Sequence, residues 1–208
     1  MPKINVPKKS NMLHQDFCKS VRYCQACHVR KDAILPVPPE MKGDRVDYWL
    51  IGQCPGETED KQNRPFSPDA PAGKICREIM QIMEIHNNYM ISNSLFCHPT
   101  NNRTPTAEEI AFCMKQHKIK EWELVKNCKA IILFGKPTTA VFLKYTYFSE
   151  VVNKFFTTQV MGETKLVGVL YHPSYFARKQ KEWNSIKETV IVNMRDELKR
   201  LINADKFL

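Results

Sequence analysis

Four short apolar runs, each ending at or near a glycine, an asparagine or a histidine, constrain the fold of this chain more than any other sequence feature. They occupy residues 46–52 (VDYWLIG), 89–93 (YMISN), 129–135 (KAIILFG) and 165–173 (KLVGVLYHP). Runs of this length between turn residues are typical of buried strands in a parallel sheet. Segments with apolar residues at helical spacing alternate with them. This alternation predicts an α/β sandwich with a short, roughly four-stranded parallel sheet.

The length and the charge of the chain limit its organisation and its partners. With 208 residues, 43% of them hydrophobic, the chain is long enough for one domain over residues 1–208, in which residues 1–20 are expected to form an irregular N-terminal arm. We expect a monomer. The net charge of +9 favours a polyanion such as nucleic acid as the partner, and the alternative is a merely basic protein.

The sequence also bears on location. No apolar run approaches the roughly 18 residues that a membrane span requires, and the N-terminus lacks the apolar stretch of a secretory signal. We therefore expect an intracellular protein of the cytoplasm or nucleoid without membrane contact.

Four of the eight cysteines have a spacing that indicates a metal site. Cys24 and Cys27 form a CxxC pair, and 15 residues separate Cys97 from Cys113. The T-x-x-E sequence at residues 106–109 predicts a helix start that fixes Cys113 in the second turn. Four thiolates suit either a tetrahedral zinc ion or a [4Fe–4S] cluster, and the ligand type does not decide between them. A zinc ribbon usually has two CxxC pairs, so the split second pair favours the cluster.

The segment IGQCPGETED, residues 51–60, follows the first apolar run and is predicted to form a strand-end loop. In a parallel sheet the functional groups gather in the loops at the carboxyl ends of the strands. The backbone after Gly52 can wrap closely around a ligand, and the acids behind it can orient a water molecule. This loop is therefore the first candidate for a working site.

Five separated segments of the chain resemble, in order and spacing, the family 4 uracil-DNA glycosylases. They are CQACHV, IGQCPGETEDKQNRPFSPDAPAG, YMISNSLFCHPTNNRTPTAEEIAFC, AIILFGKPTTAVFL and YHPSYFARKQKEW, and the match covers roughly residues 18–190. The resemblance implies the uracil-DNA glycosylase fold, a three-layer α/β/α sandwich with a short parallel sheet. It also implies a structural [4Fe–4S] cluster, away from the chemistry, on Cys24, Cys27, Cys97 and Cys113.

The activity that the resemblance implies is removal of uracil from DNA by base flipping and water attack, which leaves an abasic site. Such an enzyme is a monofunctional hydrolase of N-glycosyl bonds, and its partner is DNA that contains uracil. Two alternatives remain open: a glycosylase for another modified pyrimidine, and a non-catalytic DNA-binding member of the same fold. A zinc-stabilised binding module would be a third.

Three residues match the demands of holding a flipped uracil. Phe66 supplies a ring on which a pyrimidine can stack. Asn93 ends the second run, and its amide offers the donor and the acceptor that match O4 and N3–H of uracil but not the edge of cytosine. His172 follows the last run and can donate a hydrogen bond to O2, where charge develops as the bond breaks. The resemblance gives Asn93 and His172 these same roles.

The loop at residues 51–60 is expected to surround the base through Gly52, Gln53 and Cys54. Family 4 enzymes usually have glutamate where this chain has Gln53, and a small residue where it has Cys54. Because an amide is not a base, water activation is assigned first to Glu59, then to its neighbour Asp60 or to Asn101, which can hold a water by hydrogen bonds. Cys54 is read as a packing residue whose bulk shapes the pocket.

The segment HPSYFARKQK is expected to form a loop that grips DNA. Tyr175 and Phe176 offer an apolar wedge for the vacated stack, and Arg178 offers a cation for a phosphate. Ser174 and Arg103 are further candidates for contacts with the DNA backbone.

Overall fold

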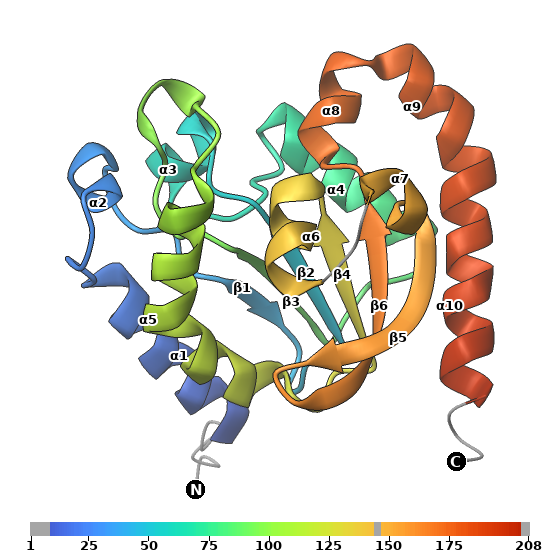
Figure 1. The fold of residues 1–208 in the computed structure, drawn as a ribbon, viewed down its shortest axis with the longest axis horizontal. Coiled ribbons are helices and arrows are strands. Elements are labelled where there is room, and N and C mark those ends of the chain that lie inside the picture. Colours follow the sequence, from blue (N-terminus) through green and yellow to red (C-terminus); the bar gives the residue numbers. More distant parts are fainter. Residues whose placement is uncertain (1–8, 144–146, 205–208) are drawn as a thin grey trace, which may run out of the picture.

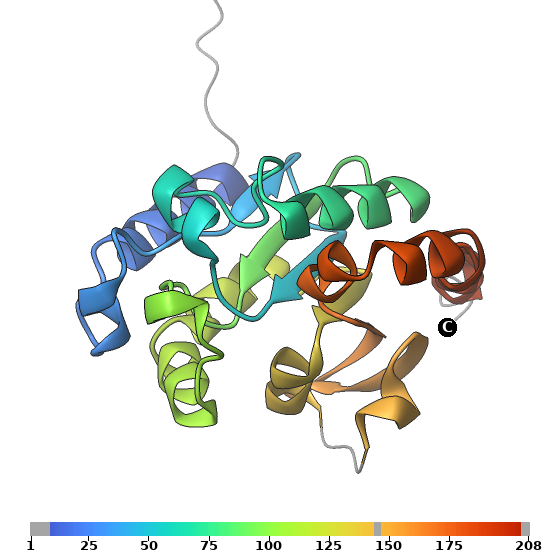
Figure 2. The ribbon, with the colours of Figure 1, turned by 90° about the horizontal axis from the view of Figure 1, so that it is seen from above.

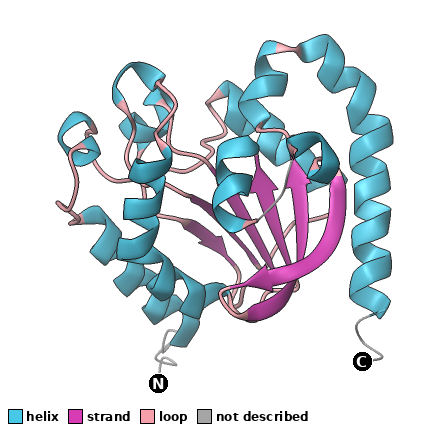
Figure 3. Ribbon diagram, viewed as in Figure 1, coloured by secondary structure: helices cyan, strands magenta, loops and turns pink. Residues whose placement is uncertain are grey.

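A six-stranded mixed sheet runs through the centre of the molecule, with helices on both of its faces (Figure 1). The structure is a computed structural model that describes residues 9–143 and 147–204. The strand order is β1-β3-β2-β4-β6-β5, in which β3, β2, β4 and β6 are parallel and the two edge strands are antiparallel to their neighbours. Figure 3 shows the strands fanned between the two helical layers.

The elements follow one another along the chain in an α/β order. The strands are β1 Glu40–Lys42, β2 Tyr48–Gly52, β3 Tyr89–Asn93, β4 Ala130–Phe134, β5 Lys154–Val160 and β6 Glu163–Leu170. The longer helices are α1 Lys9–Arg22, α4 Pro71–Ile82, α5 Ala107–Val125 and α10 Val192–Ala204. The shorter helices are α2 Val29–Asp32, α3 Glu57–Gln62, α6 Lys136–Phe142, α7 Phe148–Val151, α8 Pro173–Arg178 and α9 Gln180–Ile186. A 3₁₀ turn, η1 Thr100–Asn102, and a π-helical turn, η2 Lys187–Ile191, complete them.

Side chains alternate across the sheet and build a separate core on each face. Leu50 and Ile132 belong to the core that includes residues of α4, α8 and α10, whereas Trp49, Ile51 and Ile131 belong to the core shared with α5 and α6. Figure 2, seen from above, shows the sheet between these two helical layers. The central strands are therefore buried on both faces, which explains their continuous apolar runs.

The fold confirms the predicted α/β/α sandwich and extends its sheet. The four predicted runs form the parallel strands β2, β3, β4 and β6, and β1 and β5 add two antiparallel edge strands. Strand β5 was not expected, because its burial alternates and its outer face carries polar residues.

The N-terminal segment differs from its prediction. Residues 9–20 are not irregular but lie in helix α1, which places Phe17 and Val21 against α5 in a third apolar cluster. These two residues are four apart and face the same side of the helix, so their burial accounts for the helix in this position. Residues 1–8 of the predicted arm lie outside the described residues.

The register of the sheet brings four strand ends to one edge. Gly52 pairs with Asn93, and Phe134 pairs with Leu170. The residues that follow these ends, including His172, therefore gather above the same edge of the sheet. Within residues 9–143 and 147–204, no helix has both the length and the apolar character needed to cross a membrane.

Candidate active site

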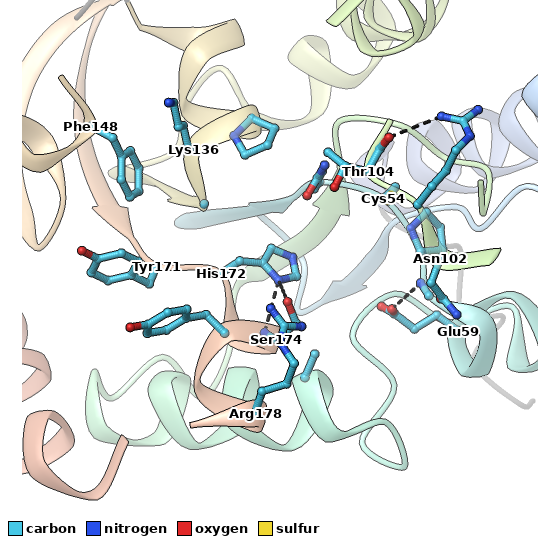
Figure 4. Close-up of a pocket in the computed structure, with 18 residues that line it drawn as sticks. Cys54, Glu59, Asn102, Thr104, Lys136, Phe148, Tyr171, His172, Ser174 and Arg178 are labelled. Atoms are coloured by element: carbon cyan, nitrogen blue, oxygen red, sulfur yellow. Dashed lines mark hydrogen bonds between the residues drawn. The ribbon is translucent and has the colours of Figure 1, made fainter. Parts of the chain in front are cut away.

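An open pocket of about 640 Å³ lies above the carboxyl ends of the parallel strands. Its walls come from the loop after β2, from residues 102–104 and 135–137, from Phe148 and from residues 171–178. Figure 4 shows His172 and Ser174 between an aromatic side, with Phe148 and Tyr171, and a polar side, with Asn102 and Glu59. The predicted loop 51–60 and the predicted segment after β6 thus face one cavity.

Gly52, Asn93 and Phe66 do not line this pocket, but they contact one another beside His172, which does. A Cβ atom on Gly52 would overlap Oδ1 of Asn93 and would lie 2.5 Å from Cζ of Phe66, so only glycine leaves room for both side chains. Asn93 is 1% exposed, and both Nδ2 and Oδ1 are buried without a hydrogen-bond partner in the protein. Phe66 has a φ of 45°, a left-handed conformation that is strained for a bulky residue.

His172 stands next to this group with one ring nitrogen free. The ring centroids of His172 and Phe66 lie 5.7 Å apart with an interplanar angle of 34°. The Ser174 backbone N–H donates to Nδ1 of His172 at 3.2 Å, and the Ser174 hydroxyl lies 2.9 Å from the same nitrogen. Since Nδ1 accepts, the neutral ring carries its proton on Nε2, which is buried and has no partner.

The charge state of His172 follows from its surroundings. Burial, with a smaller contribution from the Arg178 charge, lowers the pKa of His172 to about 4. The imidazole is therefore neutral at physiological pH and presents an N–H donor to the pocket.

Glu59 lines the pocket, but both of its carboxylate oxygens are occupied. One oxygen accepts from the Gly56 backbone N–H at 2.8 Å at the start of α3, and the other accepts from the Phe66 backbone N–H. Burial raises the pKa of Glu59, and the two backbone donors oppose that rise. The geometry makes Glu59 the support of the strained Phe66 backbone, and a G-x-x-E capping sequence was the signal for it.

Asp60 and Asn101 lie outside the pocket lining. The Asp60 carboxylate accepts from the backbone N–H groups of Ile34 and Leu35 at 3.0 and 3.4 Å, so it ties the segment after α2 to α3. Asn101 is exposed at the turn η1. Its neighbour Asn102 faces the pocket instead. The expected roles of Asp60 and Asn101 in orienting water therefore have no geometric support.

The segment after His172 is helical rather than a loop, because Pro173 begins α8 and His172 caps it. Phe176 is 2% exposed and packs against Trp183 with ring centroids 5.3 Å apart, so it belongs to the core and does not form a surface wedge. Tyr175 lines the pocket, and its hydroxyl donates to Glu182 at 2.5 Å. Arg178 also lines the pocket and is exposed.

Arg103 lines the pocket with its guanidinium engaged by Glu109. Its two terminal nitrogens donate to the two Glu109 oxygens at 2.8 and 2.6 Å. This fork, with help from Thr106 and His28, lowers the pKa of Glu109 to about 2 against the opposing effect of burial. Thr106 also caps α5 as predicted, which places Cys113 in the second turn.

The aromatic side of the pocket was not predicted from the sequence. Tyr171 stacks on Tyr175 with ring centroids 5.1 Å apart and an interplanar angle of 21°. Phe148 contacts Tyr171 edge-to-face at 5.6 Å. The position of Tyr171 directly before His172 was the one signal available, while Phe148 comes from a distant helix.

The four cysteines of the predicted metal site line one small apolar cavity between α1, the residues before α2 and α5. Burial raises the pKa of Cys97 to about 12, and the nearby Cys113, Cys27 and Cys24 add to that rise. Burial likewise raises the pKa of Cys113 to about 12. Across the residues that the structure describes, no three His, Cys, Asp or Glu side chains are already arranged to hold a metal ion.

Comparison with known proteins agrees with this geometry. The model of the Uracil DNA glycosylase superfamily matches residues 39–202. A type-4 uracil-DNA glycosylase of Saccharolobus solfataricus is 32% identical over 74% of this chain and 72% of its own length. Type-4 uracil-DNA glycosylases of Thermotoga maritima and Archaeoglobus fulgidus are 30% and 26% identical, each over 82% of this chain and over 85% and 87% of their own lengths. The chain therefore belongs to the uracil-DNA glycosylase superfamily and, within it, to the type-4 uracil-DNA glycosylases.

Proposed function

We propose that this protein removes uracil from DNA by hydrolysing the N-glycosidic bond and leaves an abasic site. The observation that carries the proposal is the set of buried, unpartnered polar atoms beside the Phe66 ring: Oδ1 and Nδ2 of Asn93 and Nε2 of His172. Burying such atoms without partners costs about 1 to 3 kcal/mol each, and a bound base with matching groups would recover that cost.

The Asn93 amide reads the base edge. Its Nδ2 donates to O4 of uracil and its Oδ1 accepts from N3–H, which is the reverse of what cytosine presents. Gly52 leaves the space in which the amide and the Phe66 ring lie together. A base reaches this position only after it leaves the helical stack, so the reaction begins with flipping.

His172 stabilises the leaving base. When the bond between C1′ and N1 breaks, its electron pair stays on the uracil ring and negative charge appears at O2. The Nε2–H of the neutral imidazole donates to O2 in a water-poor site, where a fixed donor is most effective. Ser174 holds the ring in the tautomer that this step requires.

The mouth of the pocket supports DNA binding. Arg178 is exposed, lines the pocket, and has no hydrogen-bond or ion-pair partner among the described residues, so it is available for a phosphate. Arg103 and Tyr175 are already held by acidic residues and contribute fixed surfaces rather than free charges. We also propose that the protein acts as a single-domain monomer.

The four-cysteine set, Cys24, Cys27, Cys97 and Cys113, is proposed to hold a [4Fe–4S] cluster. Four cysteine thiolates are the usual ligand set of a [4Fe–4S] cluster. The donor set and its apolar surroundings fit this group. The cluster would supply a structural link between α5 and the segments around α2. Iron and sulfide analysis of the purified protein tests this assignment.

Incubation with uracil-containing oligonucleotides, followed by alkaline cleavage at abasic sites, tests the activity. We expect cleavage at uracil and none at cytosine or thymine. His172→Ala should lower the rate about 10² to 10³-fold, because one donor to the developing oxyanion is lost. His86→Ala, a change at an exposed histidine, is the matched control. Full activity of the His172→Ala protein would refute the assignment.

A further inference from the structure

The bound base would pair with the free polar atoms of Asn93 and His172, and one further buried polar atom of the pocket would still have no partner. Nε2 of Gln53 is buried and has no hydrogen-bond partner in the protein. Its side-chain oxygen likewise has no partner among the described residues. The backbone of Gln53 is fixed at the end of β2, where its carbonyl accepts from Leu95 N–H at 3.0 Å. The side chain is therefore positioned, lines the pocket and lacks an acceptor.

No carboxylate or imidazole of the described lining is free to take a proton from water. Glu59 is the one carboxylate among the described lining residues, and two backbone N–H groups occupy its oxygens. Asp60 lies outside the lining and holds the segment after α2. His172 accepts at Nδ1, and its Nε2 is the donor that faces the base.

We propose that Gln53 is the residue that holds the attacking water, and that hydrolysis in this protein proceeds without a general base. This inference rests on the proposed glycosylase function and concerns its second step. Nε2–H of Gln53 donates to one lone pair of the water, and the other lone pair faces C1′ of the deoxyribose.

The step balances without a base. The bond between C1′ and N1 breaks first, and its electron pair leaves with uracil. The water oxygen then forms the new bond to the cationic C1′, and the surplus proton of that water passes through solvent to the uracil anion. A strongly electrophilic sugar does not require a deprotonated nucleophile, so an amide that positions water is sufficient.

Other titratable groups line the pocket around Gln53, and each could contribute to a pH dependence. They are Cys54 and Glu59 from the segment after β2, Arg103 before α5, Lys136 of α6, Tyr171 and His172 after β6, and Tyr175 and Arg178 of α8. Burial raises the pKa of Cys54 to about 12 and lowers that of His172 to about 4. Neither side chain changes its charge between about pH 5 and 9. Burial raises the pKa of Glu59, which is present in the wild-type protein and in both variants, so a group placed at position 53 is identified by the difference between the variant and wild-type pH profiles.

The test compares single-turnover rates of uracil release for the wild-type protein, Gln53→Glu and Gln53→Ala between about pH 5 and 9. The wild-type protein supplies the reference pH profile. Gln53→Glu should gain a limb that rises with pH, because a carboxylate at this position takes the proton from water. Gln53→Ala should lose about 10 to 10²-fold in rate with little change in DNA affinity.

Controls separate this inference from the proposed function. Gln159→Glu makes the same change on the exposed face of β5 and should leave the wild-type pH profile unchanged. Gln53→Glu keeps the shape of the side chain, so it remains informative if the alanine variant unfolds. A wild-type pH profile for Gln53→Glu, or a wild-type rate for Gln53→Ala, would overturn the role of Gln53 and leave the glycosylase function standing. Absence of uracil release by the wild-type protein would overturn both.

Discussion

The two sides of the pocket differ in whether their buried polar atoms have hydrogen-bond partners within the protein. Around the base position, Asn93, His172 and Gln53 hold buried polar atoms that have no partner in the protein. On the other side, Glu59 in the lining and Glu109, which holds the lining residue Arg103, each accept hydrogen bonds at both carboxylate oxygens. The first side carries an energetic cost that a ligand can recover, whereas the second side stabilises the scaffold.

This difference changes how acidic residues in a strand-end loop are interpreted. The sequence ETED suggests several candidates for activating water, and the structure shows that position alone does not select among them. Glu59 and Asp60 use their charge to bind backbone N–H groups, so they hold the loop in shape. The chemically available groups are neutral: an amide, an imidazole and a second amide.

The largest effect is expected when an unpartnered polar side chain beside the base position is replaced by an apolar one. Asn93→Leu should lower kcat/KM for uracil DNA about 10⁴-fold, because the site can no longer match the base edge. The same change should leave the free energy of unfolding unchanged or raise it, since it removes a buried amide that has no partner. Oligonucleotide kinetics and urea unfolding measure the two effects.

Asn87→Leu, at an exposed position, is the matched control and should change neither quantity. A large loss of stability in Asn93→Leu would show that the Asn93 amide is part of the scaffold, and the contrast between the two sides would then fail.

Removal of a hydrogen-bonded carboxylate such as Glu59 should, in contrast, lower the stability of the protein. Glu59→Ala should lower the free energy of unfolding by about 3 kcal/mol, because two backbone N–H groups, those of Gly56 and Phe66, lose their acceptor. Activity should fall with it as the Phe66 ring loses its support. Glu57→Ala removes only an exposed ion pair with Lys61 and should leave the free energy of unfolding nearly unchanged. Equal unfolding midpoints in urea for the two variants would contradict the support role.

The buried, unpartnered imidazole of His172 should also make the stability of the protein depend on pH. The folded-state pKa of His172 is about 4, whereas the ordinary value is 6.5. Between these values the unfolded chain binds the proton and the folded protein does not, so stability decreases as the pH falls from about 6.5 towards 4. Above about pH 6.5 both states are neutral and the group has no effect.

His172→Asn should therefore lose less stability than the wild-type protein when urea unfolding is compared at pH 7 and pH 5. The catalytic rate of the wild-type protein should show no inflection near the ordinary histidine pKa. Such an inflection would mean that the imidazole is solvated and charged in the free enzyme.

The sequence was informative where burial leaves a periodic pattern. The runs that became β2, β3, β4 and β6 are apolar throughout because helices cover both faces of the sheet. The polar residues that end these runs, Asn93 and His172, therefore fell at the site edge. Helix α1 was missed because only Phe17 and Val21 of its residues are fully buried, too few to show a helical period.

Other features depend on contacts between distant residues, which no local pattern reports. From its sequence context Phe176 resembles a surface wedge, but in the folded chain Trp183 of α9 packs against it. The saturation of Glu59 depends on the backbone of Phe66, seven residues away in a left-handed conformation. Whether a polar side chain is paired or unpaired is thus a property of the folded chain, although the residue types themselves can be read from the sequence.

The smallest predicted effect concerns the one pocket cation without a recorded protein partner in the described residues, Arg178. Arg178→Ala should weaken DNA binding by roughly tenfold at low salt, uniformly across sequences, and lower the slope of log affinity against log salt by about one. Arg200→Ala removes the same charge from an exposed position of helix α10, away from the pocket, and should leave that slope unchanged.

By contrast, Arg103→Ala should change the slope less than Arg178→Ala, because Glu109 already neutralises Arg103. Fluorescence anisotropy over a salt series distinguishes these outcomes, and equal slopes for Arg178→Ala and Arg103→Ala would show that pairing within the protein does not decide which cations meet DNA.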